Sequence, residues 1–213
     1  MSLPKVFTLA AAAFSLVGLN CVASGQESLT FSGTATYVPV QVTLREEAII
    51  GWQQIHRMYV TAGTNKWAFC VPDNFHVDTS NPYKVVLVQA DYNCFLSIRI
   101  LTPIGGDLAP EYCRRQLSDA FPEANVTGEF AQRAGATSGP GFDLQWTNSN
   151  SVPQSARVAY FPSPAGVVEL VLLSKSEKFT ESRRFFDFLR ASYCSDQSGP
   201  IMPIQAPKEP PRN

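Results

Sequence analysis

Charge is scarce in this sequence. Only 16% of its 213 residues are charged, and 17 lysines and arginines nearly balance 18 aspartates and glutamates, which leaves a formal net charge of −1. Proteins that bind nucleic acid or an anionic membrane surface carry a concentrated excess of positive charge, so we expect no nucleic-acid partner. With 45% apolar and 11% aromatic residues, the chain is too hydrophobic to be disordered as a whole.

Long apolar runs are also missing. The uncharged segment over residues 6–19 has about 14 residues, whereas a transmembrane helix needs roughly 20, so no membrane span is expected. This segment follows Lys5 and precedes small residues, an order typical of a secretory signal peptide. We therefore expect residues 1–25 to be removed and the protein to be secreted or periplasmic. Lipid anchoring at Cys21 is the less favoured alternative, because Asn20 stands where a lipobox has a small residue.

Metal-ligand and redox spacings are missing too. No C-x-x-C motif occurs, and the only histidines are His56 and His76, so a Cys/His metal site has too few ligands. No phosphate-binding glycine motif occurs either, so no cofactor is expected.

The cysteines that remain after signal removal are even in number. Cys70, Cys94, Cys113 and Cys194 therefore predict two disulfides in an exported chain. The first two lie in β-like runs and the last two in helix-like runs. We favour pairing Cys70 with Cys94 and Cys113 with Cys194, although three pairings are possible.

The start of the mature chain predicts an extended arm over residues 26–43, followed by a helix. Thr43 and Glu46 have the spacing of a capping box, and apolar residues recur with a helical period from Ala48 to Tyr59. A β-structure is the alternative for this segment.

The remainder predicts strands, hairpins and two more helices. Strands are expected over residues 66–71, 75–79, 84–90 and 94–101, and hairpins join residues 126–133 with 142–147 and 156–161 with 166–173. Pro110 starts a helix that stops before Pro122, and a closing helix begins near Thr180 and ends at Cys194. Residues 198–213 include five prolines and predict a disordered tail, which leaves residues 44–197 as a single domain.

Apolar residues do not alternate in Val85–Val88 or in Val167–Leu173, so both faces of these strands must be covered. The connections are short, which favours antiparallel neighbours. The expected fold class is therefore α/β (α+β): a three-layer α/β/α sandwich with a central, mainly antiparallel sheet.

The order of these parts resembles the PsbP-like fold family. The likeness covers roughly residues 44–194 and includes the Pro-x-x-Phe start at Pro72–Phe75, the strand ending Val-Glu-Leu-Val-Leu-Leu-Ser at Ser174, and the last helix over residues 179–193. The resemblance implies an α/β/α sandwich and a non-catalytic binding or assembly role. No sharp family motif is matched, so the resemblance transfers no functional residue.

Glu169 is a lone carboxylate within an apolar strand, which is typical either of acid–base chemistry or of a structural ion pair. If Phe161 pairs with Val167, Arg157 lies diagonally across from Glu169 on the same face, and we predict a structural ion pair between them. His56 falls on the apolar stripe of the first expected helix and is interpreted as a hydrogen-bonded or partly exposed core histidine rather than a general base. No catalytic motif accompanies these residues, so no catalytic residue is predicted.

Two arginine pairs lie on the expected helices. Arg114 and Arg115 follow Cys113, and Arg183 and Arg184 lie on the closing helix that ends at Cys194. If a disulfide joins the two helices, the four arginines form one basic strip able to bind an acidic partner. Otherwise each pair is a solvated helix face.

These observations favour an exported, non-enzymatic binding or assembly factor whose protein or envelope partner is unknown. A small secreted hydrolase using Glu169 or His56 is one alternative, and it requires these groups to line a pocket. A structural component of the cell envelope, tethered by its proline-rich tail, is another.

Overall fold

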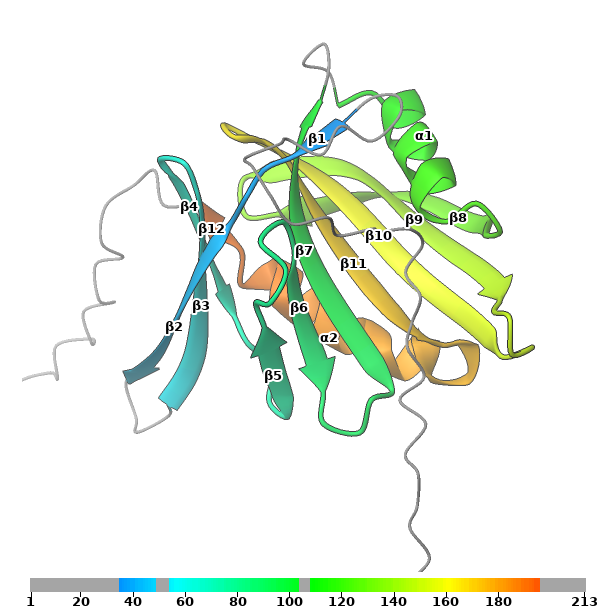
Figure 1. The fold of residues 1–213 in the computed structure, drawn as a ribbon, viewed down its shortest axis with the longest axis horizontal. Coiled ribbons are helices and arrows are strands. Elements are labelled where there is room, and N and C mark those ends of the chain that lie inside the picture. The colour runs from blue at the N-terminus through cyan, green and yellow to red at the C-terminus, as the bar shows by residue number, and fades with distance from the viewer. Residues whose placement is uncertain (1–34, 49–53, 104–107, 196–213) are drawn as a thin grey trace, which may run out of the picture.

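The computed structural model of this protein describes residues 35–48, 54–103 and 108–195 (Figure 1). The expected signal peptide with Cys21 and the expected tail over residues 198–213 lie outside the described residues. Within them, the chain forms two antiparallel sheets and two α-helices.

The large sheet has the strand order β5-β6-β7-β11-β10-β9-β8, and β1 pairs with β7 beyond the end of β6. Every ladder in it is antiparallel, so the prediction of a mainly antiparallel sheet is confirmed. Its strands are β1 (Ala35–Tyr37), β5 (Phe75–Asp78), β6 (Val85–Gln89), β7 (Cys94–Pro103), β8 (Asn125–Ala134), β9 (Thr137–Thr147), β10 (Pro153–Ser163) and β11 (Gly166–Lys175).

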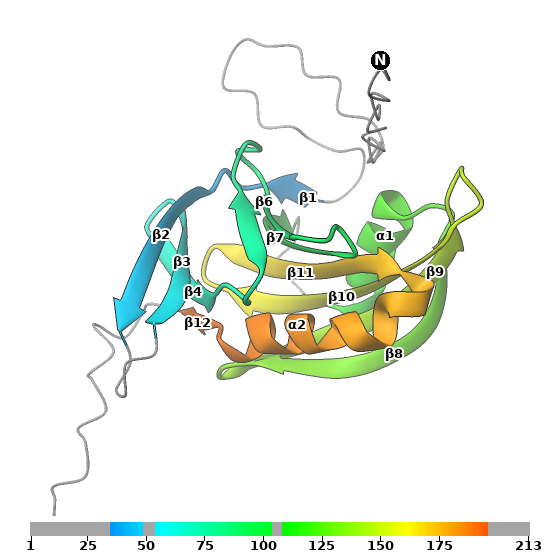
Figure 2. The same cartoon turned by 90° about the horizontal axis from the view of Figure 1, so that it is seen from below.

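The two helices pack against opposite faces of this sheet (Figure 2). The first helix, α1 (Pro110–Ala120), buries Cys113 and Leu117 in a cluster with Val158 of β10. A 3-10 turn, η1 (Ser176–Lys178), leads into α2 (Phe179–Ala191), which buries apolar residues in the larger core cluster on the other face. The non-alternating apolar strand β11 therefore has a covering on each face, as its sequence predicts, whereas Val86 of β6 is only half-buried.

The covering by α1 is incomplete. On the face that α1 shares, Phe95 and Ser97 of β7 remain half-buried, whereas Leu96 and Ile98 on the α2 face are fully buried. Figure 1 shows α1 over one end of the sheet only. The complete three-layer sandwich expected from the sequence is therefore not confirmed.

The small sheet has the order β12-β4-β3-β2 and corrects the expected first helix. Its strands are β2 (Gln41–Ala48), β3 (Gln54–Ala62), β4 (Asn65–Cys70) and β12 (Cys194–Ser195). The helix predicted from Thr43 to Tyr59 is wrong, because Met58 and Val60 alternate with polar residues and are fully buried opposite β4. Pairing with the neighbouring strands β2 and β4, together with burial of one face, thus overrides the local capping signal.

The β10–β11 hairpin has a different register from the predicted one. Phe161 lies opposite Val168 rather than Val167, because the strands continue to Ser163 and Gly166 and leave a two-residue turn. A shift of one residue moves every side chain of a strand to the other face relative to its partner. This shift decides the partner of Glu169.

Candidate functional site

A row of charged and tyrosine side chains crosses the α1 face of the large sheet. Glu169 of β11 lies opposite Arg99 of β7 on one side and Tyr160 of β10 on the other. Lys84 directly precedes β6, whose Val85 pairs with Ile98, and it interacts electrostatically with both Arg99 and Glu169. We call Lys84, Arg99, Tyr160 and Glu169 the buried row.

Arg99 is the centre of the buried row. Its Nε donates a hydrogen bond to Oε2 of Glu169, and its Nη1 donates one to the hydroxyl of Tyr37 at 3.0 Å. The Tyr37 ring also lies 5.0 Å from the guanidinium carbon. Because the Glu169 side chain is only 1% exposed, this pairing compensates a charge that would otherwise be buried alone.

The tyrosines beside this row are held neutral. Burial raises the pKa of Tyr37, raises that of Tyr112 to about 12, and raises that of Tyr160 well above its ordinary value. Burial also lowers the pKa of Lys84, and the neighbouring Arg99 lowers it further. Within the described part of the chain, the hydroxyls of Tyr112 and Tyr160 are buried without a hydrogen-bond partner.

The predicted ion pair between Arg157 and Glu169 is not formed. The register of β10 and β11 places Arg157 on the α2 face and Glu169 on the α1 face. Arg157 instead makes two hydrogen bonds of 2.8 Å to the carboxylate of Asp143, and its guanidinium carbon lies 4.6 Å from the centre of the Phe130 ring.

Glu169 and His56 do not share a site. The imidazole of His56 is exposed on β3, where Nδ1 lies 3.9 Å from Oε1 of Glu46, so it agrees with the exposure allowed for it but does not belong to the core. Glu169 is buried on the large sheet against Arg99. The structure therefore does not bring together the two residues named for a hydrolase. In the described segments, His, Cys, Asp and Glu side chains form no group of three or more that could hold a metal ion.

The two disulfides expected from the cysteine count are not seen. Cys70, Cys94, Cys113 and Cys194 are all unpaired thiols. Cys113 lies on the α1 face, whereas Cys194 pairs with β4 after α2 and lies on the other side of the large sheet. The pairing of Cys113 with Cys194 is predicted because both lie in helix-like runs of sequence. Such a run does not indicate which face of the sheet its helix covers.

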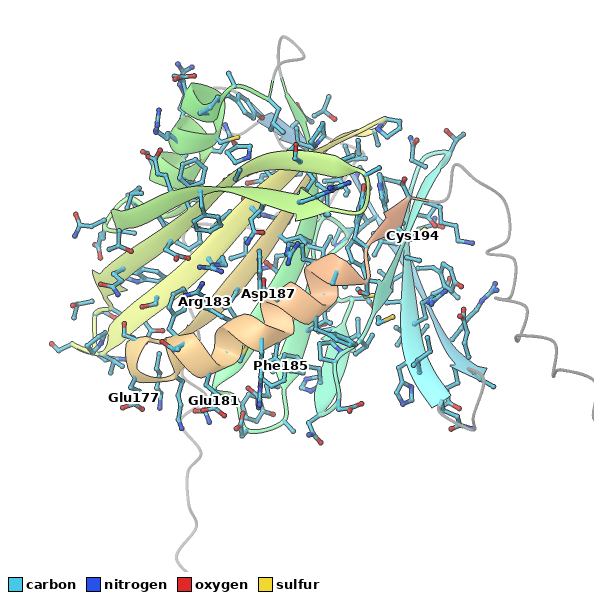
Figure 3. The ribbon with its side chains drawn as sticks, turned by 180° about the vertical axis from the view of Figure 1, so that it is seen from behind. Glu177, Glu181, Arg183, Phe185, Asp187 and Cys194 are labelled. Carbon is cyan, nitrogen blue, oxygen red and sulfur yellow. The ribbon has the colours of Figure 1, made fainter. Side chains whose placement is uncertain are left out.

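The single arginine strip is excluded by the placement of the helices. Arg114 and Arg115 lie on α1, whereas Arg183 and Arg184 lie on α2. Figure 3 views the molecule from behind, and there α2 lies in front of the large sheet. Arg114 is also occupied, because its Nε and Nη2 donate to the Glu129 carboxylate at 2.9 and 2.7 Å. Each pair is therefore a separate helix face.

A third group of charges lies on the outer face of the small sheet. Lys66 of β4 has its ammonium 4.5 Å from the centre of the Tyr59 ring, and Arg45 of β2 has its guanidinium carbon 5.2 Å from it. Arg57 completes the group and pairs with Glu47 at 3.1 Å, while the Tyr59 hydroxyl also donates to Glu47. We call Arg45, Arg57, Tyr59 and Lys66 the cationic face.

The cationic face gathers three positively charged side chains, of which Arg57 is paired with Glu47 and Arg45, on the edge strand β2, is exposed. Cations over an aromatic ring on a partly exposed sheet are suited to binding an anionic group rather than to bond-making chemistry. The sequence analysis missed this group because it assigned residues 43–59 to a helix. The sequence signal for the cationic face is a strand-like alternation in β3: Arg57, Tyr59 and Thr61 alternate with the buried Met58 and Val60.

Sequence reasoning also missed Arg99 and Asp143, the true partners of the two buried charges. Both residues stand at alternating positions within strands, and period-two alternation alone places them on a sheet face. Their pairing depends on the strand order, which the sequence does not contain.

No family model matches the chain, and no curated protein matches it. Among solved structures it is similar to the Saccharomyces cerevisiae Ran-binding protein Mog1p, at 10% identity and a TM-score of 0.47, over 72% of this chain and 96% of that one. It is also similar to LpqN, involved in cell envelope biogenesis of Mycobacterium tuberculosis, at 18% identity and a TM-score of 0.46, over 73% and 91% of the two chains.

Cyanobacterial PsbP from Synechocystis is a third similar structure, at 14% identity and a TM-score of 0.45, over 74% of this chain and 92% of that one. The structures similar to this chain thus include a member of the PsbP-like fold family, which the sequence resembles. At TM-scores of 0.45 to 0.47, these likenesses concern the arrangement of elements and carry nothing about function. The helices of the described residues include none that is long and apolar enough to cross a membrane.

Proposed function

We propose that this protein is an exported, non-enzymatic binding or assembly factor that engages an acidic region of a protein partner through the cationic face. The observation that carries the proposal is the gathering of Arg45, Arg57 and Lys66 around Tyr59, with the Arg45 side chain exposed at the edge of the sheet. Export is supported by the signal-peptide pattern over residues 1–25, and we propose that residues 44–197 act as one domain.

The other charged groups support this choice. Arg157 is buried and hydrogen-bonded to Asp143, so it is not available to a macromolecule, and Arg99 is half-buried with its guanidinium held by Glu169 and Tyr37. Arg114 is held by Glu129. On the cationic face, Arg45 is exposed on the edge strand and lies against the Tyr59 ring, and no carboxylate of the described residues pairs with it. An uncompensated exposed charge accelerates capture of an oppositely charged partner and makes capture sensitive to salt.

Charge reversal tests this function in the full-length protein. The variant combining Arg45→Glu and Lys66→Glu is expected to recover at least tenfold less partner from the producing cell than the wild type, because four units of charge change at the binding surface. Recovery by the wild type is expected to fall as salt is raised from about 50 to about 500 mM, since the Debye length shortens.

The matched control reverses the two exposed helix arginines instead. Arg115→Glu combined with Arg184→Glu changes the net charge by the same amount but leaves the cationic face intact, so partner recovery should stay close to the wild type. Equal loss in both double variants would show a non-specific charge effect and contradict the assignment to the cationic face.

A further inference from the structure

The strand β2 has an open edge beside the cationic face. It ends the small sheet: one side pairs with β3, and no other described strand pairs with its second side. Most of its residues are exposed. Such an edge presents a row of backbone N–H and C=O groups that can pair with a further strand.

The side chains of β2 divide between two faces. Val42 and Leu44 lie opposite the buried Val60 and Met58 of β3 and therefore belong to the inner face. Leu44 is nevertheless 55% exposed, because nothing described covers it on the side of the open edge. Arg45 belongs to the outer face with Tyr59. Along the open edge of β2, the apolar Leu44 on the inner face is therefore followed directly by the cationic Arg45 on the outer face.

We propose, as a deepening of the proposed function, that an extended segment of the protein partner adds to β2 as a further strand of the small sheet. An acidic residue of that segment lies opposite Arg45 on the outer face. Apolar residues at the alternate positions lie on the inner face and cover Leu44 and Val42. Backbone hydrogen bonds supply affinity in this mode of recognition, and alternate side chains supply specificity.

Charge at the other end of β2 limits the partner further. Glu46 and Glu47 follow Arg45, and Glu47 is already paired with Arg57 at 3.1 Å. A carboxylate directly opposite Glu46 or Glu47 would be destabilising, because like charges across neighbouring strands repel. The segment therefore carries neutral or basic residues at this end and its acidic residue in the middle.

A second copy of this chain fits the same edge less well. In a two-fold arrangement centred on Arg45, this residue would lie opposite its own copy, with like charges in contact. An arrangement centred on Glu46 brings the two Glu46 carboxylates together and places Arg45 opposite Glu47, which Arg57 already holds at 3.1 Å. An arrangement centred on Leu44 avoids this repulsion but places Arg45 opposite Thr43 and leaves its charge unpaired. Charge complementarity therefore favours an acidic segment of another protein.

Synthetic eight-residue peptides test the proposal with the full-length protein. The probe alternates valine with glutamate at its centre and carries lysine at the end that faces Glu46. The comparison peptide has lysine in place of each glutamate. By fluorescence anisotropy, we expect the acidic peptide to bind at least tenfold more tightly than the basic peptide, and Arg45→Glu to remove this preference.

Backbone methylation separates strand addition from simple charge attraction. Methylating the alternate amides that face β2 removes the hydrogen bonds of the added strand but leaves every side chain unchanged. We expect it to weaken binding at least tenfold, whereas methylating the opposite set of amides should change binding less than twofold. This comparison uses the wild-type protein, so the folding of a variant does not affect it.

The outcomes distinguish this inference from the function on which it rests. One outcome is that the acidic peptide binds tightly, that Arg45→Glu abolishes this binding, and that neither methylation affects it. This outcome would overturn strand addition and leave the cationic face as a binding surface. Equal binding of both peptides, together with normal partner recovery by the Arg45→Glu, Lys66→Glu variant, would overturn both. A concentration-dependent dimer that excludes the peptide would identify a second copy as the occupant and overturn the inference.

Discussion

Glu169 illustrates at the scale of a single residue how a buried charge is held. Its carboxylate is 1% exposed and depends on Arg99, which also donates to Tyr37 at 3.0 Å. The desolvation of such a pair is offset by its hydrogen bonds only while both partners are present. The carboxylate that the sequence shows inside an apolar strand is thus the buried partner of Arg99 in a structural ion pair.

Removing one partner of this pair is therefore expected to be costly. Glu169→Gln should lower the free energy of unfolding by about 3 kcal/mol, because it leaves the Arg99 charge largely buried and uncompensated. The combination of Glu169→Gln with Arg99→Met should cost less than the sum of the two single changes. Urea denaturation measures all three variants.

Glu129→Gln is the matched control, since its carboxylate is paired with Arg114 at the surface and should cost less than about 1 kcal/mol. Additive effects of the Glu169 and Arg99 changes would contradict direct coupling.

At the scale of the element, the β10–β11 hairpin is fixed by a glycine. Gly166 has φ of +126°, and a Cβ built on it would lie 2.2 Å from the carbonyl oxygen of Leu101 in β7. Only glycine adopts this backbone region without strain and permits the close approach of β7. The turn therefore sets the β10–β11 register, which places Glu169 opposite Tyr160 and on the other face from Arg157.

Gly166→Ala is expected to lower the free energy of unfolding by about 3 kcal/mol, because backbone strain and a clash with backbone act together. Gly63→Ala is the matched control: its φ is +58° but no atom lies within 4 Å of the added Cβ. It should cost only about 1 kcal/mol for the left-handed conformation. Denaturation midpoints measure both, and equal losses would show that the approach of β7 is unimportant.

At the scale of the whole molecule, several buried groups keep their protons in the folded state. Burial raises the pKa of Cys94, Cys113 and Tyr112 to about 12 and raises that of Tyr160 well above its ordinary value. The unfolded chain releases these protons from about pH 8.5 for the thiols and about pH 10 for the phenols. The folded state therefore binds more protons than the unfolded state in this range. Lys84 acts in the opposite direction, because burial lowers its pKa and the folded state therefore loses this proton before the unfolded state does.

The stability of the protein should therefore fall as pH rises from about 9 to about 12. Each group that the folded state keeps protonated contributes up to about 1.4 kcal/mol per pH unit to this decline. Urea denaturation at a series of pH values measures it. Cys113→Ala should make the decline shallower, and a stability that is constant up to pH 11 would contradict the burial of these groups.

How far the sequence predicts this molecule depends on the range of the interaction involved. The strands between Asn65 and Pro103, the helix from Pro110 and the closing helix agree with their predicted positions. Their apolar periodicity is local, and local periodicity is visible in a sequence. The hairpin at residues 41–62 was assigned to a helix, because the pairing of β3 with β4 outweighs the capping signal at Thr43.

The sequence by itself determined the antiparallel character of the strands, the positions of both helices and the burial of Glu169 in a strand covered on both faces. Only the tertiary structure decided which faces meet. It placed Cys113 and Cys194 on opposite sides of the large sheet, separated Glu169 from Arg157 by a one-residue shift of the β10–β11 register, and paired Glu169 with Arg99 of β7. It also gathered Arg45 and Lys66 around Tyr59. The physical reason is that a side chain's face depends on register and strand order, which arise from contacts between residues far apart in the chain.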